Sequence, residues 1–407
     1  MATLQDPKEL ACGLTLPNRF AKAAMAEKMD DGSNVPSDAI IRVYKEWAKG
    51  GWGLIITGNV HVDPAYLNTN GDLSVESARL SDPTYIKGWQ KWADACATPT
   101  VLQINHPGRQ SPRSAGTRGA FVQAVAPSAI PLDFGPGLLQ RLLRTVAFGS
   151  PRELTTEEVE GVIEKFVQAA KLAYDSGFNG VEVHGAHGYL LAQFMSSRTN
   201  TRTDQYGGSA SKRAEPVVQI LSRIRAATSP SFCIGLKLNS ADVSHSGDTI
   251  EDFIEQLQLF VDCGIDFLEI SGGTYENPTM SDGVANNNAT TKSSSTVQRE
   301  AFFLSFASII RERFPSLPLI VTGGFRTRGA MGDAIESGQC DVIGIGRPAA
   351  LAPNAPTEML NTKDLTLKLQ APSIEMGWLK KYLRVRALGA STENNWYAAQ
   401  IRKLGLL

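Results

Sequence analysis

The sequence predicts a (β/α)8 barrel, the TIM-barrel class of α/β fold, and two observations lead to this prediction. From Asn18 onward, short apolar runs alternate with helical stretches, which is the pattern of a parallel sheet with crossover helices. There are eight such apolar runs, the number that closes a barrel of this class. The expected strands are Arg19 to Ala23, Leu54 to Gly58, Thr100 to Ile104, Gly180 to Val183, Cys233 to Leu238, Phe267 to Ser271, Leu319 to Thr322 and Val342 to Ile345.

A doubly wound open sheet is the alternative architecture for this alternation. That fold binds dinucleotides at a Gly-x-Gly-x-x-Gly turn after its first strand. No such turn occurs near the first expected strand, so the barrel is the preferred interpretation. The 407 residues exceed an average barrel, but a single barrel with insertions reaches this length.

The helices between the expected strands carry readable start and stop signals. Thr155 and Glu158 form a capping box ahead of an apolar stripe with helical spacing. A similar start is expected at Asp248 with Glu251, and Gly264 is expected to end that helix. These helices would form the outer ring of the barrel, with their apolar faces against the strands.

Two connections are too long to be simple turns, namely Asn105 to Pro151 and Gly272 to Val297. Because each follows an expected strand, we expect both to lie over the mouth formed by the carboxyl ends of the strands. In that position they would gate the entry of a ligand and set specificity.

The barrel pattern stops near residue 360, so we expect a barrel domain over residues 1–360 and a C-terminal helical extension over residues 361–407. The extension contains four large aromatic residues: Trp378, Tyr382, Trp396 and Tyr397. Such residues pack on the barrel or form a subunit contact, such as that of a homodimer. The sequence leaves both alternatives open.

Composition excludes several classes of function. The chain has 42% hydrophobic and 20% charged residues, and its formal net charge is -1 without long charged runs. Neither nucleic acid nor an anionic membrane is therefore an expected partner, and a small molecule fits better. The amino-terminal residues lack the pattern of a signal peptide, and the longest apolar run is too short to span a bilayer. Together with five widely spaced cysteines, these features predict a cytoplasmic protein.

The stretch from Val181 to Leu191 is the strongest candidate for a functional site. His184 and His187 stand three residues apart directly after an expected buried strand, and Tyr189 follows two residues later. In a parallel barrel, the residues just past a strand's carboxyl end face the active site. Two imidazoles and a phenol at that place can hold an oxyanion and deliver a proton.

Two other interpretations of the histidine pair, a metal site and a structural role, agree less well with the sequence. A metal site needs a third and a fourth ligand, and no Cys, His or Asp cluster stands nearby at a suitable spacing. We therefore expect no metal. A purely structural role in the core fits poorly with the flanking glycines Gly185 and Gly188.

The stretch resembles the old yellow enzyme family of flavin-dependent ene-reductases, in its single-barrel form. The resemblance rests on His184, His187, Tyr189 and the later run Tyr206-Gly207-Gly208-Ser209, which recur in this order in the family. It extends from roughly Leu10 to Ala350. It implies that the barrel binds flavin mononucleotide (FMN), with the flavin ring over the barrel mouth and the phosphate near the last two strands.

The resemblance also implies which residues contact the flavin ring. Residues Ala24, Met25 and Ala26 match the segment whose backbone lies along the ring, and Gly58 matches a position that requires a small residue. Gln103 matches the glutamine that hydrogen-bonds the pyrimidine edge. A glutamine on an apolar inner strand needs a buried partner in any case.

Lys237 matches the family's basic residue beside flavin N1 and O2, and it stands in an otherwise apolar strand. A buried ammonium without a counter-charge is costly, and the negative charge of the reduced flavin would offset that cost. A lysine whose stem packs while its head reaches solvent is the alternative.

The residues expected at the phosphate follow the last two strands. They are Gly323, Gly324, Gly346 and Arg347. Glycine lets backbone N–H groups approach an anion, and barrels of this class often bind phosphate at this place. Arg347 would add a bidentate contact to the phosphate.

These roles imply a mechanism. NADH or NADPH would reduce the flavin, and an α,β-unsaturated carbonyl compound would then accept hydride from flavin N5 at its β-carbon. His184 and His187 would bind the carbonyl oxygen, and Tyr189 would protonate the α-carbon. The alternatives are a redox-neutral isomerase or cyclase and, from another class, a barrel that only binds a ligand.

Two positions depart from the family pattern. Ala26 stands where the family commonly has a threonine or cysteine that hydrogen-bonds the flavin near O4. Lys28 stands where one branch of the family has a tyrosine that contacts substrate. Alanine cannot form that hydrogen bond, and Lys28 leaves the contacts on that side of the substrate pocket undetermined by the resemblance.

Overall fold

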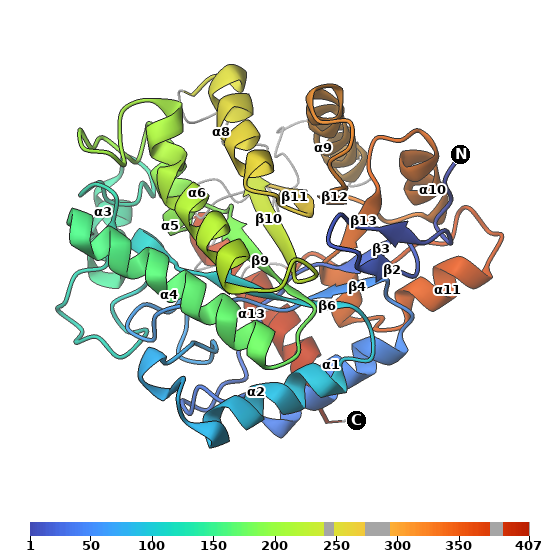
Figure 1. Ribbon diagram of the computed structural model, residues 1–407, viewed down its shortest axis with the longest axis horizontal. Coiled ribbons are helices and arrows are strands. Elements are labelled where there is room, and N and C mark those ends of the chain that lie inside the picture. The colour runs from blue at the N-terminus through green and yellow to red at the C-terminus, as the bar shows by residue number, and fades with distance from the viewer. Residues whose placement is uncertain (240–247, 273–293, 375–385, 407) are drawn as a thin grey trace.

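A closed barrel of parallel strands forms the centre of the molecule (Figure 1), for which a computed structural model describes residues 1–239, 248–272, 294–374 and 386–406. Among these residues, eight strands follow one another around the barrel, and pairing of the first strand in this order with the last closes the ring. In spatial order they are β4 (Leu54–Ile56), β3 (Phe20–Lys22), β13 (Val342–Ile345), β12 (Leu319–Thr322), β11 (Phe267–Ser271), β10 (Cys233–Asn239), β9 (Gly180–Gly185) and β6 (Thr100–Asn105). The predicted fold class is confirmed, and the ends of the expected strands shift by no more than two residues.

The helices surround these strands in Figure 1, so that each crossover covers the outside of the barrel. The main helices are α1 (Asp38–Lys49), α2 (Pro83–Ala95), α4 (Thr156–Asp175), α5 (Leu190–Met195), α6 (Ala210–Ala227), α8 (Ile250–Asp262), α9 (Ser294–Arg313), α10 (Arg328–Glu336), α11 (Ala355–Asn361) and α13 (Arg386–Leu404). Short 3-10 turns are η1 (Ser77–Arg79), η2 (Gly108–Gln110) and η3 (Arg347–Ala350). No helix in the described ranges is long and apolar enough to cross a membrane.

The predicted capping box of α4 is confirmed, because Thr155 and Glu158 exchange side-chain and backbone hydrogen bonds. The predicted start of α8 was wrong by one residue. Thr249 is the N-cap residue, and it forms the capping box with Asp252. Asp248 instead accepts hydrogen bonds from Arg213 at 2.8 Å and from the backbone N–H of Ser197. A carboxylate beside a buried arginine is held there more strongly than in an exposed cap.

Inside the barrel, the lower half, at the amino ends of the strands, is apolar. The upper half, at their carboxyl ends, is polar. A two-stranded hairpin, β1 (Lys8–Glu9) and β2 (Thr15–Leu16), brings apolar side chains against the lower ends of the barrel strands. The lower layer includes Leu10, Leu16, Leu54, Val101, Phe267 and Val342. Because alternate residues of a strand face the interior, the inward positions higher on β6 and β9 are Gln103, Asn105, Glu182 and His184. The polar layer therefore lies at the carboxyl-end mouth.

The first long connection folds into small elements around the mouth. It contains η2, then β7 (Val125–Ala126) and α3 (Leu138–Ala147), and it ends at β8 (Arg152–Glu153), which pairs with β7. A further short strand, β5 (Val60–His61), extends the sheet beside β6. The second long connection falls mainly on residues 273–293, which lie outside the described residues. Gating by either connection stays a prediction.

The described part of the C-terminal extension packs on the barrel. Figure 1 places α13 (red) behind the strands, and its Tyr397 is buried and donates a hydrogen bond to the carbonyl of Pro372 at 2.8 Å. Lys28 donates a hydrogen bond to Asn395 at 2.7 Å, which joins the loop after β3 to this helix. Of the predicted aromatic residues, Trp378 and Tyr382 lie outside the described residues. A homodimer contact stays a prediction.

Candidate active site

The two predicted histidines form a hydrogen-bonded pair at the end of β9. His184 Nδ1 accepts the backbone N–H of Ala186 at 3.2 Å, so its proton is on Nε2 when the ring is neutral. That Nε2 lies 3.1 Å from His187 Nδ1, and His187 Nε2 lies 3.2 Å from the Ser271 hydroxyl. His187 has a φ of 60°, a left-handed backbone conformation that turns its ring back toward His184.

Both imidazoles are neutral in this environment. Burial lowers the pKa of His184 well below its ordinary value, and the neighbouring His187 and Lys237 act in the same direction. Burial and then the Lys237 charge lower the pKa of His187 to about 3. Because each neutral ring has one N–H group, the pair offers hydrogen-bond donors without a fixed positive charge.

The hydrogen bond between the rings modifies the predicted role of the pair. We expected both histidines to point at a substrate oxygen, whereas His184 Nε2 faces His187. A substrate oxygen that took the His184 proton would therefore have to replace His187 Nδ1 as the acceptor. The pair forms a hydrogen-bonded chain that includes Ser271, a residue that sequence reasoning did not identify.

Tyr189 lies beside the pair, as the sequence predicts. Its ring packs edge-on against His184 with the centroids 4.9 Å apart, and it is 7% exposed. Its hydroxyl accepts a hydrogen bond from the side-chain amide of Asn68 at 3.0 Å. The residue stands at the N-cap position of α5, so the helix start fixes where the phenol lies.

Below the histidines, a buried polar layer joins two predicted residues to two that sequence reasoning missed. Gln103 donates a hydrogen bond to Glu182 at 2.5 Å, and the Lys237 ammonium lies 2.8 Å from the Glu269 carboxylate. The Lys237 and Glu269 side chains are at most 3% exposed. Lys237 is therefore buried as predicted, but the protein itself supplies its counter-charge, so the argument from a missing counter-charge was wrong. The alternative of a solvent-reaching head is also wrong.

The two carboxyl groups of this layer have pKa values shifted in opposite directions. Glu182 Oε1 and Glu269 Oε2 are buried, and no N–H or O–H group of the described residues hydrogen-bonds either atom when both groups are ionised. Burial and the neighbouring Glu269 carboxylate raise the pKa of Glu182 well above its ordinary value. Burial acts to raise the pKa of Glu269 too, but Lys237 and a hydrogen bond from Glu182 bring it below its ordinary value. A neutral Glu182 that donates to an ionised Glu269 satisfies both oxygens.

The segment of Ala24, Met25 and Ala26 is partly exposed at the mouth. The next residue, Glu27, connects it to Gly58 through a hydrogen bond. The backbone N–H of Gly58 donates to Glu27 Oε1 at 3.0 Å and lies 2.9 Å from the hydroxyl of Tyr44. A Cβ at position 58 would lie 2.1 Å from Glu27 Oε2 and 2.4 Å from the Met25 carbonyl oxygen. The glycine is thus required by its protein neighbours, and a contact with the flavin ring stays a prediction.

The predicted phosphate residues meet at the ends of β12 and β13. Register places Thr322 opposite Gly344, so Gly323 and Gly324 lie next to the chain that leads to Gly346. A Cβ on Gly346 would meet no atom within 4 Å, so its backbone faces open space. Arg347 is not fully available for a phosphate, because it forms an ion pair with Glu393 of α13 at 2.8 Å.

One further observation, at Asn105, supports the fit of flavin mononucleotide to the residues described above. Asn105 stands two residues beyond Gln103 on the inner face of β6 and is completely buried, yet neither polar atom of its side chain has a hydrogen-bond partner among the described residues. An amide that offers both a donor and an acceptor suits the edge of a flavin ring. The open backbone at Gly346 suits the other end of the cofactor.

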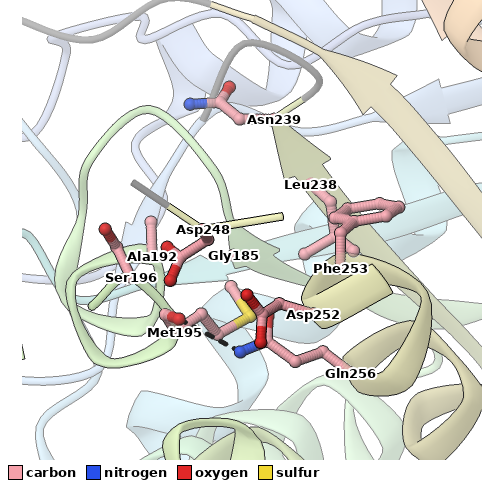
Figure 2. A pocket seen from close by; sticks show the side chains of 10 residues that line it. All are labelled: Gly185, Ala192, Met195, Ser196, Leu238, Asn239, Asp248, Asp252, Phe253 and Gln256. Carbon is pink, nitrogen blue, oxygen red and sulfur yellow. Dashed lines mark hydrogen bonds between the residues drawn. The ribbon is translucent and has the colours of Figure 1, made fainter. Parts of the chain in front are cut away.

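A separate cavity of about 40 Å³ lies between α5 and α8, next to Gly185 at the end of β9 (Figure 2). Its lining includes Met195, Leu238, Phe253 and Gln256, with Gln256 donating a hydrogen bond to the carbonyl of Met195 at 3.0 Å. None of the predicted site residues lines it. Its volume has room for only a few water molecules, since one water needs roughly 10–15 Å³, so it is too small for the proposed substrate.

The structure also bears on metal binding. In the described part of the chain, the group of potential metal donors within 4.8 Å of one another is Cys12, Cys233 and Asp266, and neither His184 nor His187 belongs to it. Asp266 already pairs with Arg225 at 2.8 Å. The histidine pair therefore has no third protein ligand among these residues.

A sequence signal existed for some of the missed residues. Glu182 stands between Val181 and Val183, and Glu269 stands between two apolar residues, which is the same pattern that identified Gln103 and Lys237. Asn68 lies in a loop 121 residues before Tyr189, and nothing in its surroundings marked it. A loop residue without periodicity can be placed only by the fold.

Comparison with known proteins identifies relatives over nearly the whole chain. The model of the NADH:flavin oxidoreductase / NADH oxidase family matches residues 6–363. An NADH-dependent flavin oxidoreductase of Hypocrea jecorina is 45% identical over 394 residues, covering 95% of this chain and 97% of the relative. One of Talaromyces variabilis is 43% identical over 402 residues, covering 97% and 96%. A cinnamate reductase of Clostridium sporogenes is 28% identical over 400 residues, covering 88% and 53%.

Solved structures share the fold. The old yellow enzyme homologue from Zymomonas mobilis has a TM-score of 0.71 at 23% identity, covering 94% of this chain and 99% of that one. Morphinone reductase has a TM-score of 0.69 at 23% identity, covering 89% and 91%. At this identity the likeness shows the barrel fold alone.

Proposed function

Because this chain belongs to the NADH:flavin oxidoreductase / NADH oxidase family, and is thus an FMN-dependent oxidoreductase, we propose that it reduces the activated carbon–carbon double bond of an α,β-unsaturated carbonyl compound. The observation that carries the proposal is the cluster of His184, His187 and Tyr189 at the carboxyl end of β9. These side chains can bind an oxyanion and supply a proton at one place. A relative that bears the name cinnamate reductase is consistent with this substrate class.

The neutral histidines suit the carbonyl end of the substrate. Negative charge grows on the carbonyl oxygen when hydride adds to the β-carbon. N–H donors stabilise that charge once the oxygen replaces His187 Nδ1 or the Ser271 hydroxyl as the acceptor. With the pKa of His187 at about 3, the donors stay neutral over the working pH range. A change in histidine protonation would therefore not limit activity between about pH 5 and pH 8.

Tyr189 is the proposed proton donor to the α-carbon. Its oxygen already accepts the Asn68 N–H, which leaves the phenolic O–H as a donor. The phenol lies against His184, so it can protonate the α-carbon of a substrate whose carbonyl oxygen the histidines bind.

The cofactor would lie over the polar layer. Gln103, Asn105 and Lys237 would bind the flavin ring, with Ala24, Met25, Ala26 and Gly58 along its other edge. Gly323, Gly324, Gly346 and Arg347 would hold the phosphate. When bound, the flavin supplies the hydride that it has received from NADH or NADPH. Pairing with Glu269 fixes the Lys237 ammonium group in the interior, where it can stabilise added negative charge.

Anaerobic half-reactions test the proposal. The purified protein should be yellow, should release flavin mononucleotide on denaturation, and should be reoxidised by an enone after reduction. Tyr189→Phe should slow that reoxidation by about 10²-fold or more, the range for a positioned general acid, and should hardly change reduction by NADH. Tyr174→Phe, at an exposed tyrosine of α4, is the matched control and should change neither rate.

Two results would contradict the proposal. A colourless protein that does not bind the flavin would exclude flavin chemistry. Substrate that is isomerised while no NADH is consumed would instead establish the redox-neutral function.

A further inference from the structure

The hydrogen bond between Asn68 and Tyr189 connects distant parts of the chain at the active site. Asn68 Nδ2 lies 3.0 Å from the phenolic oxygen, and the two residues are 121 positions apart. Asn68 comes from the loop after β5, whereas Tyr189 starts α5 after β9. The ring of Tyr189 also packs against the histidine rings, with centroid distances of 4.9 Å to His184 and 6.4 Å to His187.

The loop holds Asn68 in place from both sides. The carbonyl of Leu67 accepts a hydrogen bond from the Ser111 hydroxyl at 2.8 Å, and the backbone N–H of Thr69 donates to Asp72 at 2.8 Å. Leu67 is buried. Because both neighbours are fixed, the Asn68 amide is presented to the phenol at a defined distance rather than by chance contact of a mobile side chain.

The direction of this hydrogen bond has a chemical consequence. An amide N–H that donates to the phenolic oxygen occupies a lone pair and leaves the phenol's own proton to be donated. As that proton leaves, negative charge grows on the oxygen, and the N–H···O bond becomes stronger. An interaction that is stronger in the transition state than in the ground state accelerates the step.

We infer that Asn68 is the positioning residue of the proton donor: its amide orients the Tyr189 hydroxyl and stabilises the phenolate that forms when the proton is transferred. The inference rests on the proposed function in that the phenol protonates the substrate. Asn68 itself contacts neither the reacting carbon nor the transferred proton. It acts through Tyr189.

Three substitutions test this. Asn68→Leu removes the donor, and Asn68→Asp replaces the donor with a negative carboxylate. Both should slow enone-dependent reoxidation of the reduced flavin by about 10-fold or more, the loss expected for a hydrogen bond to a charged group, with Asn68→Asp the slower. Reduction by NADH should stay within about twofold. Asn70→Leu is the matched control, because this exposed asparagine of the same loop binds only the Ser114 carbonyl and the Gly116 N–H among the hydrogen bonds of the described residues.

A second readout separates positioning from a merely structural role. Combined with Tyr189→Phe, the Asn68→Leu change should cause no further loss of reoxidation rate, because the group it acts on is gone. Equal loss from Asn68→Leu with and without Tyr189→Phe would overturn the inference, and so would equal slowing of both half-reactions. Faster reoxidation in Asn68→Leu would show that the amide oxygen had bound the phenolic proton, which also overturns it.

A third readout does not depend on any enone. The ionisation of Tyr189 can be followed by ultraviolet absorbance as the difference between the flavin-free protein and its Tyr189→Phe variant. In Asn68→Leu the midpoint of this ionisation should move to higher pH by about one unit, and in Asn68→Asp further still. An unmoved midpoint refutes the inference even if enone reduction is confirmed. Failure of every enone refutes the proposed function while the titration still reports the hydrogen bond.

Discussion

Replacing Lys237 by methionine tests the buried ion pair that underlies the site. The substitution keeps most of the side-chain volume but removes the ammonium that lies 2.8 Å from Glu269. Glu269 is completely buried, so it is left as a carboxylate without a counter-charge beside the neutral Glu182. Removing one partner of a buried pair costs about 3–5 kcal/mol of unfolding free energy.

The cost should depend on pH, because Glu269 can take up a proton instead. With Lys237 the pKa of Glu269 lies below its ordinary value of 4.5, so its contribution is present above that pH and is lost as the pH falls. Without Lys237 its folded pKa rises above that value. If Glu269 is protonated in the folded variant, the unfolding free energy falls by about 1.4 kcal/mol for each pH unit above 4.5. This loss is about 3.4 kcal/mol at pH 7 and about 0.7 kcal/mol at pH 5.

Urea denaturation of the flavin-free protein between pH 5 and pH 8 measures this, since ligand binding would otherwise add to the apparent stability. The difference between wild type and Lys237→Met should grow with pH. The matched control is the double variant Lys237→Met with Glu269→Gln, in which both charges are gone and most of the lost stability should return. A loss that is the same at pH 5 and pH 8, or a double variant no more stable than the single one, would refute the reasoning.

Two further predictions concern the residues along the expected flavin ring. Ala26→Thr should raise the reduction potential of the bound flavin by tens of millivolts. A hydrogen-bond donor near O4 contributes roughly 1.5–3 kcal/mol, and about 1.4 kcal/mol corresponds to about 30 mV for two electrons. Spectroelectrochemistry measures this potential, and an unchanged or lower value would mean that Ala26 does not face O4. Gly58→Ala should lower the unfolding free energy by about 1–3 kcal/mol and weaken flavin binding, because its Cβ would lie 2.1 Å from Glu27 Oε2. The control is Gly161→Ala, because a Cβ at this position of α4 would meet nothing within 4 Å, and this change should raise the unfolding free energy by about 0.5–1 kcal/mol. Denaturation and flavin titration measure the two effects. Equal results for the two variants would contradict the argument.

Local patterns of the sequence were sufficient to predict the barrel and the place of its site. Apolar runs between capped helices gave the strands, because period and capping are properties of neighbouring residues. The site followed from His184, His187 and Tyr189, since residues just past a strand's end must lie at the mouth of a parallel barrel. Polar residues within apolar strands, such as Gln103 and Lys237, were candidates for the site, but for Lys237 the sequence left a solvent-reaching side chain as the alternative.

The partners of those residues were decided only by the tertiary structure. Glu269 reaches Lys237 because β10 and β11 pair in a register that sets the two residues opposite each other. Asn68 reaches Tyr189, and Glu393 reaches Arg347, because a loop and the C-terminal helix fold over the mouth. A hydrogen bond or ion pair between such residues depends on distances that register and chain path set across the whole barrel. Local sequence carries the side-chain chemistry, but it does not carry those distances.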